Sequence, residues 1–215
     1  MKPNNSAKIF SCVLLVGVTI AFAFSWAQRR PVPPSMDRRG VPGWQLDNEM
    51  PRDVFTFVRI RYSSYSGRGG KWATDYPDAD LNLSYRLQEM TSLKVHPEGK
   101  VIELTDSELF DYPFIYIVEP GDLWFAEEEV KALRKYLLNG GFLLVDDFWG
   151  GDEYDNFAHE MKRVFPDREP KELPLEHPVF HCVFDLKEKP QLPSIGQAMN
   201  GMSFEWRRGH DDGSE

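Results

Sequence analysis

The chain has 215 residues, which is enough for one domain of ordinary size and an export segment. With 41% hydrophobic and 27% charged residues it has the composition of a soluble globular domain with its own core. Its formal net charge is −9. An acidic domain repels the phosphates of nucleic acids and anionic lipid headgroups, so neither is expected as a partner.

The two cysteines exclude an internal disulfide in a processed chain. Cys12 lies in an apolar N-terminal run, and Cys182 stands alone in the remainder. Cysteines therefore cannot supply a zinc site either. Because Cys182 has Phe180, Val183 and Phe184 around it, we predict a buried small apolar side chain rather than a nucleophile.

Residues 1–27 have the parts of a secretory signal peptide. Two lysines precede an apolar run from Ile9 to Phe24, and Ser25 and Ala27 place small residues at the −3 and −1 positions. A membrane span needs about 20 apolar residues, and this run is shorter. We expect cleavage after Ala27, with retention as an N-terminal membrane anchor as the alternative. Either way the rest of the chain is exported, to the periplasm or to the outer side of the cytoplasmic membrane.

Residues 28–52 are rich in Pro, Arg and Gly and have no periodic apolar pattern, so they are predicted to be a linker. Its scattered arginines, among them Arg38, are expected to be solvated. Trp44 and Leu46 are the candidates for docking this arm on the domain, which we place at residues 53–215.

Alternating strands and helices predict an α/β domain with a mostly parallel sheet and helices on both faces. Buried strands are expected at Val54–Ile60, Val101–Leu104, Phe114–Val118 and Phe142–Val145. Apolar residues at helical spacing predict three helices, marked by Leu83, Leu87 and Met90, by Val130, Leu133 and Leu137, and by Tyr154, Phe157, Met161 and Phe165. Gly140 is expected to end the second helix with a left-handed residue. His177–His181 is predicted to be an extended segment packed on the sheet.

Carboxylates follow two of the predicted strands. Asp146 and Asp147 close the strand that starts at Phe142, and Glu119 follows Phe114–Val118. Ligands collect at the carboxyl ends of strands in open α/β sheets. Because side chains alternate along a strand, only one of the two aspartates is expected to face a ligand. These carboxylates either order loops and helix ends or form an oxygen-rich site for a divalent cation such as Mg²⁺ or Ca²⁺.

A second acidic group, Asp75, Asp78 and Asp80, is framed by Trp72 and Tyr76. Aromatic rings beside carboxylates are typical of sugar binding, through stacking and hydrogen bonds to hydroxyls, and equally of a loop that is pinned to a domain. Asp75, Trp72 and Tyr76 are therefore candidate ligand-binding residues.

Tyr62 follows the first predicted strand and leads into a glycine-rich loop at residues 67–70. The glycine spacing fits neither GxGxxG nor GxxxxGK[ST], so a phosphate-binding loop is not expected. Tyr62 itself remains a candidate ligand-binding residue because of its place at a strand end.

Nucleophilic catalysis has no support in the sequence. A nucleophile elbow needs Ser or Cys at the sharp turn between strand and helix, and this place holds Asp146, Asp147 and Phe148. No histidine lies in an HExxH-type pattern. No catalytic residue is therefore predicted.

Several motifs resemble the domain-of-unknown-function 4159 family of exported bacterial proteins. They are FVRIRY (Phe57–Tyr62), WATDYPDAD, FIYIVEPGD, EEEVKALRKYLLNGGFLLVDDFWG and HPVF. The resemblance implies a flavodoxin-like, class I glutamine amidotransferase-like three-layer sandwich, related to ThuA-like domains. Amidotransferase activity is not carried over, because Asp147 and Phe148 stand where those enzymes have a cysteine. The family domain usually continues further, so the resemblance also implies that this chain is C-terminally short and lacks the last strand.

These observations favour a non-catalytic envelope protein that binds a small ligand or a partner protein, with no cofactor other than a divalent cation. The alternative is a metal-assisted or carbohydrate-processing hydrolase that uses the strand-end carboxylates. Contact with a membrane is expected only through an uncleaved N-terminal segment.

Overall fold

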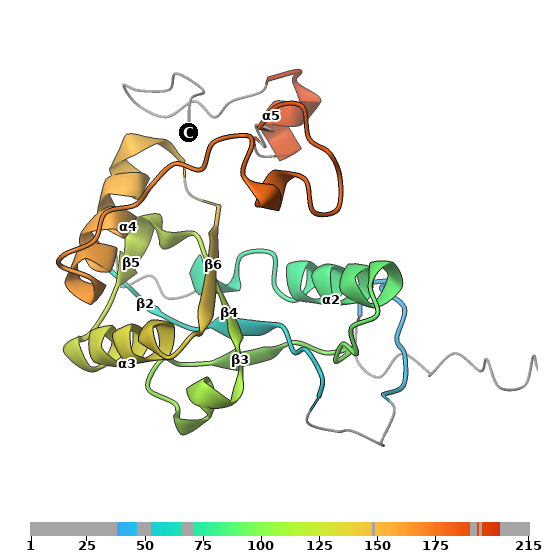
Figure 1. The fold of residues 1–215 in the computed structure, drawn as a ribbon, viewed down its shortest axis with the longest axis horizontal. Coiled ribbons are helices and arrows are strands. Elements are labelled where there is room, and N and C mark those ends of the chain that lie inside the picture. The colour runs from blue at the N-terminus through green and yellow to red at the C-terminus, as the bar shows by residue number, and fades with distance from the viewer. Residues whose placement is uncertain are drawn as a thin grey trace, which may run out of the picture.

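The computed structural model describes residues 38–46, 53–65, 71–147, 149–189, 193 and 195–202. A four-stranded parallel sheet in the order β3-β1-β4-β6 lies at its centre (Figure 1). The strands are β1 (Val58–Ile60), β3 (Lys100–Ile102), β4 (Phe114–Val118) and β6 (Phe142–Asp146). A small antiparallel ladder joins β2 (Ser63–Ser64) to β5 (Leu123–Trp124).

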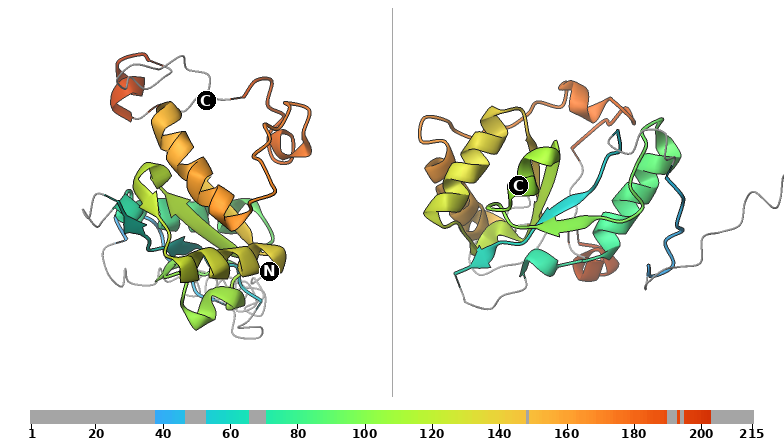
Figure 2. Two further views of the ribbon diagram at one scale, coloured as in Figure 1. Left: turned by 90° about the vertical axis from the view of Figure 1, so that its left-hand side faces the viewer. Right: turned by 90° about the horizontal axis from the view of Figure 1, so that it is seen from below.

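Helices cover both faces of the sheet, as Figure 2 shows. The helix α2 (Asp78–Met90) lies on one face, and α3 (Glu127–Leu138) and α4 (Gly150–Val164) lie on the other. The remaining helical segments are short: η1 (Lys71–Ala73), η2 (Ser107–Asp111), η3 (Pro120–Asp122), η4 (Pro178–Phe180) and α5 (Ile195–Met199). The predicted three-layer α/β fold is therefore confirmed.

Alternation along β4 divides the core into two clusters. Ile115 and Ile117 belong to the larger cluster, together with residues of α3 and α4. Tyr116 and Val118 point the other way and pack with Phe57 on the side of α2. Because both faces of β4 are covered, the strand is a nearly continuous apolar run, as parallel strands usually are.

The turn between α3 and β6 requires its two glycines for different reasons. Gly140 has a φ of 94°, so it is the left-handed residue predicted to follow the helix. Gly141 is crowded instead: a Cβ there would lie 2.2 Å from Cε1 of Tyr136. The ring of Tyr136 is buried, and its hydroxyl donates to the carbonyl of Tyr112 over 2.9 Å. The start of β6 is thereby fixed against α3.

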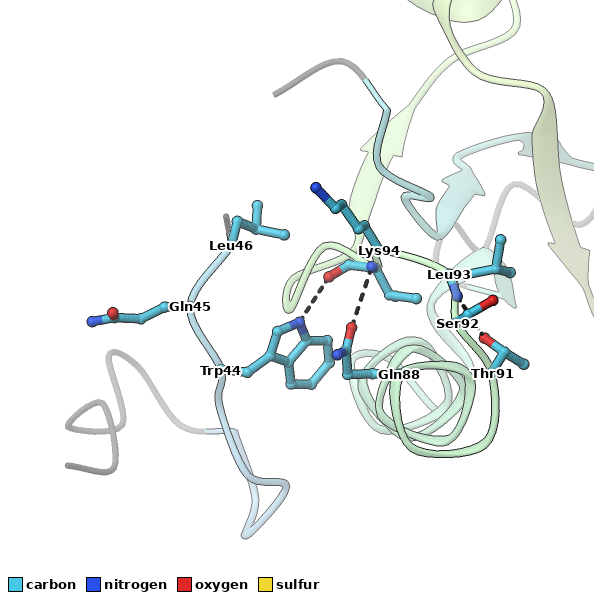
Figure 3. Close-up of a pocket in the computed structure, with 9 residues that line it drawn as sticks. Trp44, Gln45, Leu46, Gln88, Thr91, Ser92, Leu93 and Lys94 are labelled. Atoms are coloured by element: carbon cyan, nitrogen blue, oxygen red, sulfur yellow. Dashed lines mark hydrogen bonds between the residues drawn. The ribbon is translucent and has the colours of Figure 1, made fainter. Parts of the chain in front are cut away.

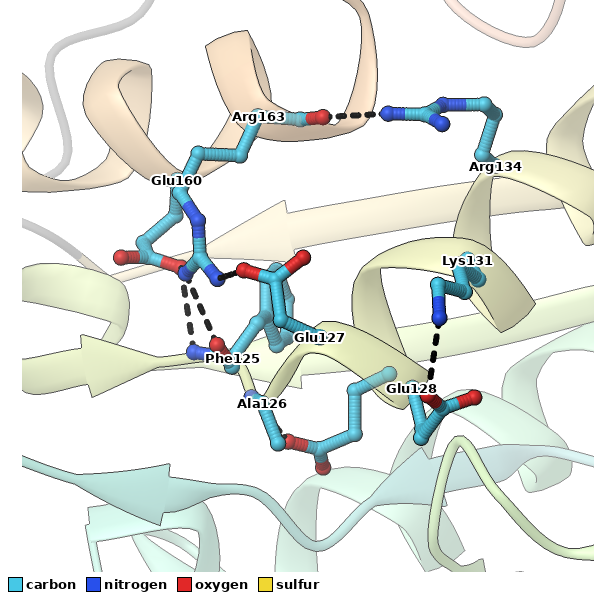
Figure 4. A network of polar contacts seen from close by, with 9 residues as sticks. Phe125, Ala126, Glu127, Glu128, Lys131, Arg134, Glu160 and Arg163 are labelled. Carbon is cyan, nitrogen blue, oxygen red and sulfur yellow. Dashed lines mark hydrogen bonds and ion pairs between the residues drawn. The ribbon is translucent and has the colours of Figure 1, made fainter.

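A buried carboxylate joins α4 to the segment before α3 (Figure 4). Glu160 is fully buried, and its Oε2 accepts from the backbone N–H of Phe125 over 3.0 Å and from Arg163 over 2.6 Å. Arg163 also donates to the carbonyl of Phe125 over 2.8 Å. At the end of α4, Arg134 donates to the carbonyls of Arg163 and Val164. These bonds set the position of α4 relative to α3.

The arm at residues 38–46 lies on the domain. Nε1 of Trp44 donates to the carbonyl of Val95 over 2.7 Å, and Trp44 forms part of a groove of about 260 Å³ beside Gln88 and Leu93 (Figure 3). The predicted docking by Trp44 is confirmed. The prediction that the arginines are solvated is wrong for Arg38, which is 6% exposed and donates to the carbonyl of Pro97 over 2.6 Å.

Two further local predictions are wrong. The segment His177–His181 is not extended, because Pro178–Phe180 forms a short 3₁₀ helix in which Val179 is 53% exposed. Cys182 is exposed rather than buried, since the whole stretch around it lies away from the core. The physical reason is the same for both: none of the residues 177–185 is buried, and none belongs to either cluster of the core.

The predicted signal peptide lies outside the described residues. Among the residues that the structure does describe, no helix has the length and apolar character needed to cross a membrane.

Candidate functional site

The chain reverses its direction across the sheet between β1 and β4. From β1 it moves outward to β3, and it then returns to the other side of β1 to form β4 and β6. In doubly wound sheets, ligands bind outside the carboxyl ends of the strands at such a switch point. The residues that follow β1, β4 and β6 therefore form the candidate site.

Asp147 lies directly after β6, at this edge. Burial and, after it, the negative charges of Glu119, Asp146 and Asp75 together raise the pKa of its carboxyl to about 6, against a hydrogen bond from the side chain of Trp149. The carboxylates predicted from two separate stretches of sequence thus lie within electrostatic reach of one another. A proton on Asp147 relieves part of their mutual repulsion.

Three of these acidic residues have a left-handed backbone. The φ angles are 54° at Asp75, 50° at Glu119 and 66° at Asp147. Such values are uncommon for residues other than glycine, although Asp tolerates them better than most. The surrounding structure stabilises this conformation at three loops that meet at the same edge, a pattern that is enriched at functional sites.

Glu119 is held by contacts at both its side chain and its backbone. Its carboxylate accepts from Nζ of Lys71 over 2.6 Å. Its backbone N–H donates to the carbonyl of Asp146 over 3.0 Å, so β4 and β6 remain joined beyond their last paired residues. One carboxylate of the site is therefore already paired with a cation from η1.

Tyr62 lies beneath the turn that follows β4, and its predicted role in ligand binding stays a prediction. It is 4% exposed, and its hydroxyl donates to the carbonyls of Val118 and Glu119 over 2.7 and 2.6 Å. Burial, together with the charges of Glu119 and Asp122, raises its pKa far above the usual value. Tyr62 thus holds the left-handed turn after β4 through hydrogen bonds to the backbone of that turn.

Trp72, Tyr76 and Asp75 lie on one loop, which Arg59 organises. Arg59 is fully buried on β1, and its Nη1 donates to the carbonyls of Trp72 and Thr74, each over 2.9 Å. Tyr76 remains 43% exposed beside Trp72, with 6.1 Å between ring centroids. The loop therefore presents an aromatic surface at the site, while Arg59 holds its backbone through hydrogen bonds from the interior.

Arg59 also connects this loop to β6 through Tyr116. Its guanidinium lies 4.9 Å from the ring centroid of Tyr116, whose hydroxyl donates to Oδ2 of Asp146 over 3.2 Å. The charge of the guanidinium is balanced by Asp80 of α2, whose Oδ1 lies 2.5 Å from Nη2 of Arg59. Sequence reasoning missed Arg59, Lys71 and Tyr116. A charged residue inside a predicted buried strand was the available signal for Arg59, since an arginine is seldom fully buried unless it is paired.

The described residues hold no group of three or more His, Cys, Asp or Glu side chains arranged to bind a metal ion. The strand β6 ends at Asp146 and Asp147 follows it, where a hydrolase of this architecture would carry a Ser or Cys nucleophile. The edge instead offers carboxylate oxygens, one ammonium group and two aromatic rings. Such an arrangement can accept hydrogen bonds and stabilise positive charge.

The chain was compared with known proteins. A family model described as domain of unknown function (DUF4159) matches residues 56–215. No curated protein matches the chain. The family match covers the sheet, its helices and every residue of the candidate site, and the chain therefore belongs to the DUF4159 family.

Proposed function

We propose that this protein is a non-catalytic binding domain of the cell envelope, and that it takes a small ligand at the carboxyl edge of β1, β4 and β6. The chemistry of the edge favours a ligand that brings hydrogen-bond donors, as ammonium or hydroxyl groups do. Export rests on the signal-peptide pattern of residues 1–27.

The observation that carries this proposal is the electrostatic state of Asp147. Its pKa of about 6 reflects burial beside three other carboxylates, so an ionised Asp147 costs free energy at neutral pH. A ligand with donors or positive charge would lower that cost when it binds. Binding and loss of the proton from Asp147 are therefore expected to be linked.

Trp72 and Tyr76 complement these carboxylates. Their rings lie on the loop that also carries Asp75, and Tyr76 is open to solvent. Aromatic faces attract organic cations and can stack on the apolar faces of sugar rings. Carboxylates and aromatic rings together support a ligand with both donor groups and an apolar surface.

The alternative, a metal-assisted or carbohydrate-processing hydrolase that uses Glu119, Asp146, Asp147 and Asp75, stays a prediction. No specific contact favours it over binding. Glu119 is paired with Lys71, Asp146 accepts from Tyr116 and Asp147 accepts from Trp149, so three of the four carboxylates already have partners.

The test is thermal unfolding of the full chain at pH 7 with glucosamine, N-acetylglucosamine, choline or spermidine, and separately with Mg²⁺ or Ca²⁺. A ligand present at 100 times its Kd stabilises the folded state by about 2.7 kcal/mol, which a melting curve resolves readily. We expect an organic donor to raise the melting temperature at pH 7, and the shift to shrink at pH 5 as Asp147 becomes protonated.

Asp147→Asn should abolish the shift, whereas Glu128→Gln, which changes an exposed carboxylate on α3, should leave it unchanged. A shift only with a divalent cation would favour the metal-dependent alternative. No shift with any of these compounds, or an equal shift in Asp147→Asn, would overturn the proposed site.

A further inference from the structure

The HPVF motif begins a turn that fixes the backbone of a histidine outside the core. His177 caps the 3₁₀ helix η4, because its Nδ1 accepts from the backbone N–H of Val179 over 3.3 Å. Pro178 occupies the first turn of η4, where its missing N–H is not needed. The helix ends after Phe180, and His181 follows as its C-cap, with its backbone N–H donating to the carbonyl of Pro178 over 3.0 Å.

Both nitrogens of the His181 ring lie against acceptors. Nδ1 lies 2.6 Å from Oδ1 of Asp185, and Nε2 lies 2.8 Å from the carbonyl oxygen of Leu175. Neither an ionised carboxylate nor a carbonyl group can donate, so each contact needs an N–H on the ring. Neutral imidazole has one N–H, whereas the imidazolium has two. The two contacts together therefore require a positively charged His181.

The charged groups around the ring favour that state. Hydrogen bonds to Asp185 and to the carbonyl of Leu175 raise the pKa of His181 above its ordinary value of 6.5, and the negative charges of Asp185 and Glu176 add to the effect. The other carboxylate oxygen of Asp185 binds Lys187. Hydrogen bonds from Lys187 and His181 lower the pKa of Asp185, so this acceptor stays ionised over the range in which His181 loses its proton.

The contacts of His181 join two parts of one loop. Leu175 precedes η4 and Asp185 follows it, so the ring bridges the chain on both sides of the short helix. Further out, an ion pair between Glu172 and Lys189 brings the two ends of the loop together. Of these three contacts, only the two made by His181 depend on a group that titrates near neutral pH.

We propose that His181 is a pH-operated latch, which joins Leu175 to Asp185 as an imidazolium and releases Leu175 when it loses a proton. The carboxylate of Asp185 is the stronger acceptor, because a hydrogen bond to a charged group is stronger than one to a neutral carbonyl. The remaining proton therefore stays on Nδ1, and Nε2 turns a lone pair towards the carbonyl of Leu175. Two facing acceptors repel, so the chain before η4 separates from the ring. The inference does not depend on the proposed ligand.

The direction of the pH effect follows from the raised pKa of His181. The folded chain holds this proton more tightly than the unfolded chain does. The latch therefore contributes fully to the stability of the loop below about pH 6.5, and its contribution is lost as the pH rises through the raised pKa.

NMR titration of the full chain, with its histidines labelled with ¹³C and ¹⁵N, tests this latch. The variant His181→Gln identifies the signal of His181. We expect the pKa of His181 to lie above 6.5 in the wild type and to fall in Asp185→Asn, which removes the charge of the acceptor. Glu188→Gln is the matched control, since Glu188 is an exposed carboxylate three residues further along the chain, and it should leave the pKa of His181 unchanged. A pKa at or below 6.5 in the wild type, or equal falls in the two variants, would overturn the inference.

Two further measurements distinguish a latch from a histidine that titrates without moving the loop. Nuclear Overhauser contacts between the ring of His181 and Leu175 should be present at pH 5 and lost at pH 9. The ¹⁵N shifts of the neutral ring should place its proton on Nδ1. Contacts with Leu175 that persist at pH 9, or a neutral ring with its proton on Nε2, would contradict the release of Leu175 and overturn the inference.

Discussion

At the scale of single residues, the site combines an unfavourable charge with an uncommon backbone conformation at Asp147. The left-handed φ of 66° restricts this position to few residue types, and Asn is one that tolerates it well. Asp147→Asn therefore removes the charge without adding backbone strain. This one substitution therefore separates the effect of the charge from the effect of the backbone conformation.

We expect Asp147→Asn to stabilise the ligand-free protein at pH 7. The pKa of Asp147 is about 6 in the folded protein, against an ordinary value of 3.8 for an aspartate that is open to solvent, as in the unfolded chain. The folded protein thus binds the proton more tightly, and its stability falls as pH rises from about 4 through about 6. Allowing for solvent at this half-buried group, the gain is roughly 1 kcal/mol, or a few degrees in melting temperature.

Melting curves between pH 3 and 8 check this prediction. The difference between Asp147→Asn and the wild type should shrink as the pH falls through about 6 and disappear towards pH 3, below the ordinary pKa of 3.8, where Asp147 is protonated in both the folded and the unfolded chain. A variant that is less stable at pH 7, or a difference that does not change with pH, would contradict the charge argument.

The carboxylates of the site were predictable from sequence, but their arrangement was not. Asp146, Asp147 and Glu119 each follow an apolar run, and the rule for strand ends places them at one edge. The hydrogen bond of Tyr62 could not be predicted, because its hydroxyl contacts Val118, which is 56 residues away in sequence. Long-range partners of this kind leave no periodic signal.

At the scale of elements, one buried ion pair joins β1 to α2. Arg59 and Asp80 are 0% and 1% exposed at their side chains, and Nη2 of Arg59 lies 2.5 Å from Oδ1 of Asp80. Burial raises the pKa of Asp80, while the hydrogen bonds and charge of Arg59 oppose that change. The pair fixes the helix on the sheet and the loop between them at the site.

We expect Arg59→Met to destabilise the protein by about 3–5 kcal/mol, because it leaves the buried carboxylate of Asp80 without its cation. Denaturant unfolding measures this loss. Arg61→Met is the matched control two residues further along the chain. Arg61 pairs with Glu103 at the surface, where ion pairs contribute less than about 1 kcal/mol. The double variant Arg59→Met, Asp80→Leu should recover part of the stability. Equal losses for Arg59→Met and Arg61→Met would contradict the role of the pair.

The elements themselves followed from local patterns in most cases. The predicted strand Phe114–Val118 has the same bounds in the structure, and α3 begins at Glu127, the first of three acidic residues in its first turn. The first strand was predicted to begin at Val54, but β1 begins at Val58. Before that residue, Phe55 forms only an isolated bridge with Val95. Apolar runs predict burial well, whereas pairing within a sheet depends on where the neighbouring strand begins.

At the scale of the whole molecule, the family fold and the docking of the arm by Trp44 were predictable, and the burial of Arg38 was not. Membership of the DUF4159 family and the mostly parallel sheet both agree with the motifs read from the sequence. The arm at residues 38–46 had the composition of a linker, yet it packs on the loop before β3 through Arg38 and Trp44. The composition of a segment predicts only its average tendency to order. Here two side chains, Arg38 and Trp44, bind the segment to the domain despite that composition.

Trp44 holds this arm on the domain. Trp44→Ala removes the hydrogen bond to Val95 and the contact with Tyr85, whose ring centroid lies 6.1 Å away. The arm should then open more often, since about 2 kcal/mol of apolar burial is lost. Hydrogen exchange at the amide of Val41, which donates to the carbonyl of Arg38, should rise roughly 30-fold, because each 1.4 kcal/mol is a factor of ten.

Gln45→Ala is the matched control, because Gln45 is exposed on the same arm and should change exchange little. Amides of β1 and β4 should exchange at the wild-type rate in both variants, since the arm lies outside the sheet. If exchange in β4 rises together with Val41, the arm and the sheet open as one cooperative unit and residues 38–46 belong to the core of the domain. Unchanged exchange at Val41 would mean that Arg38, with its bonds to Pro97 and Pro42, holds the arm without Trp44.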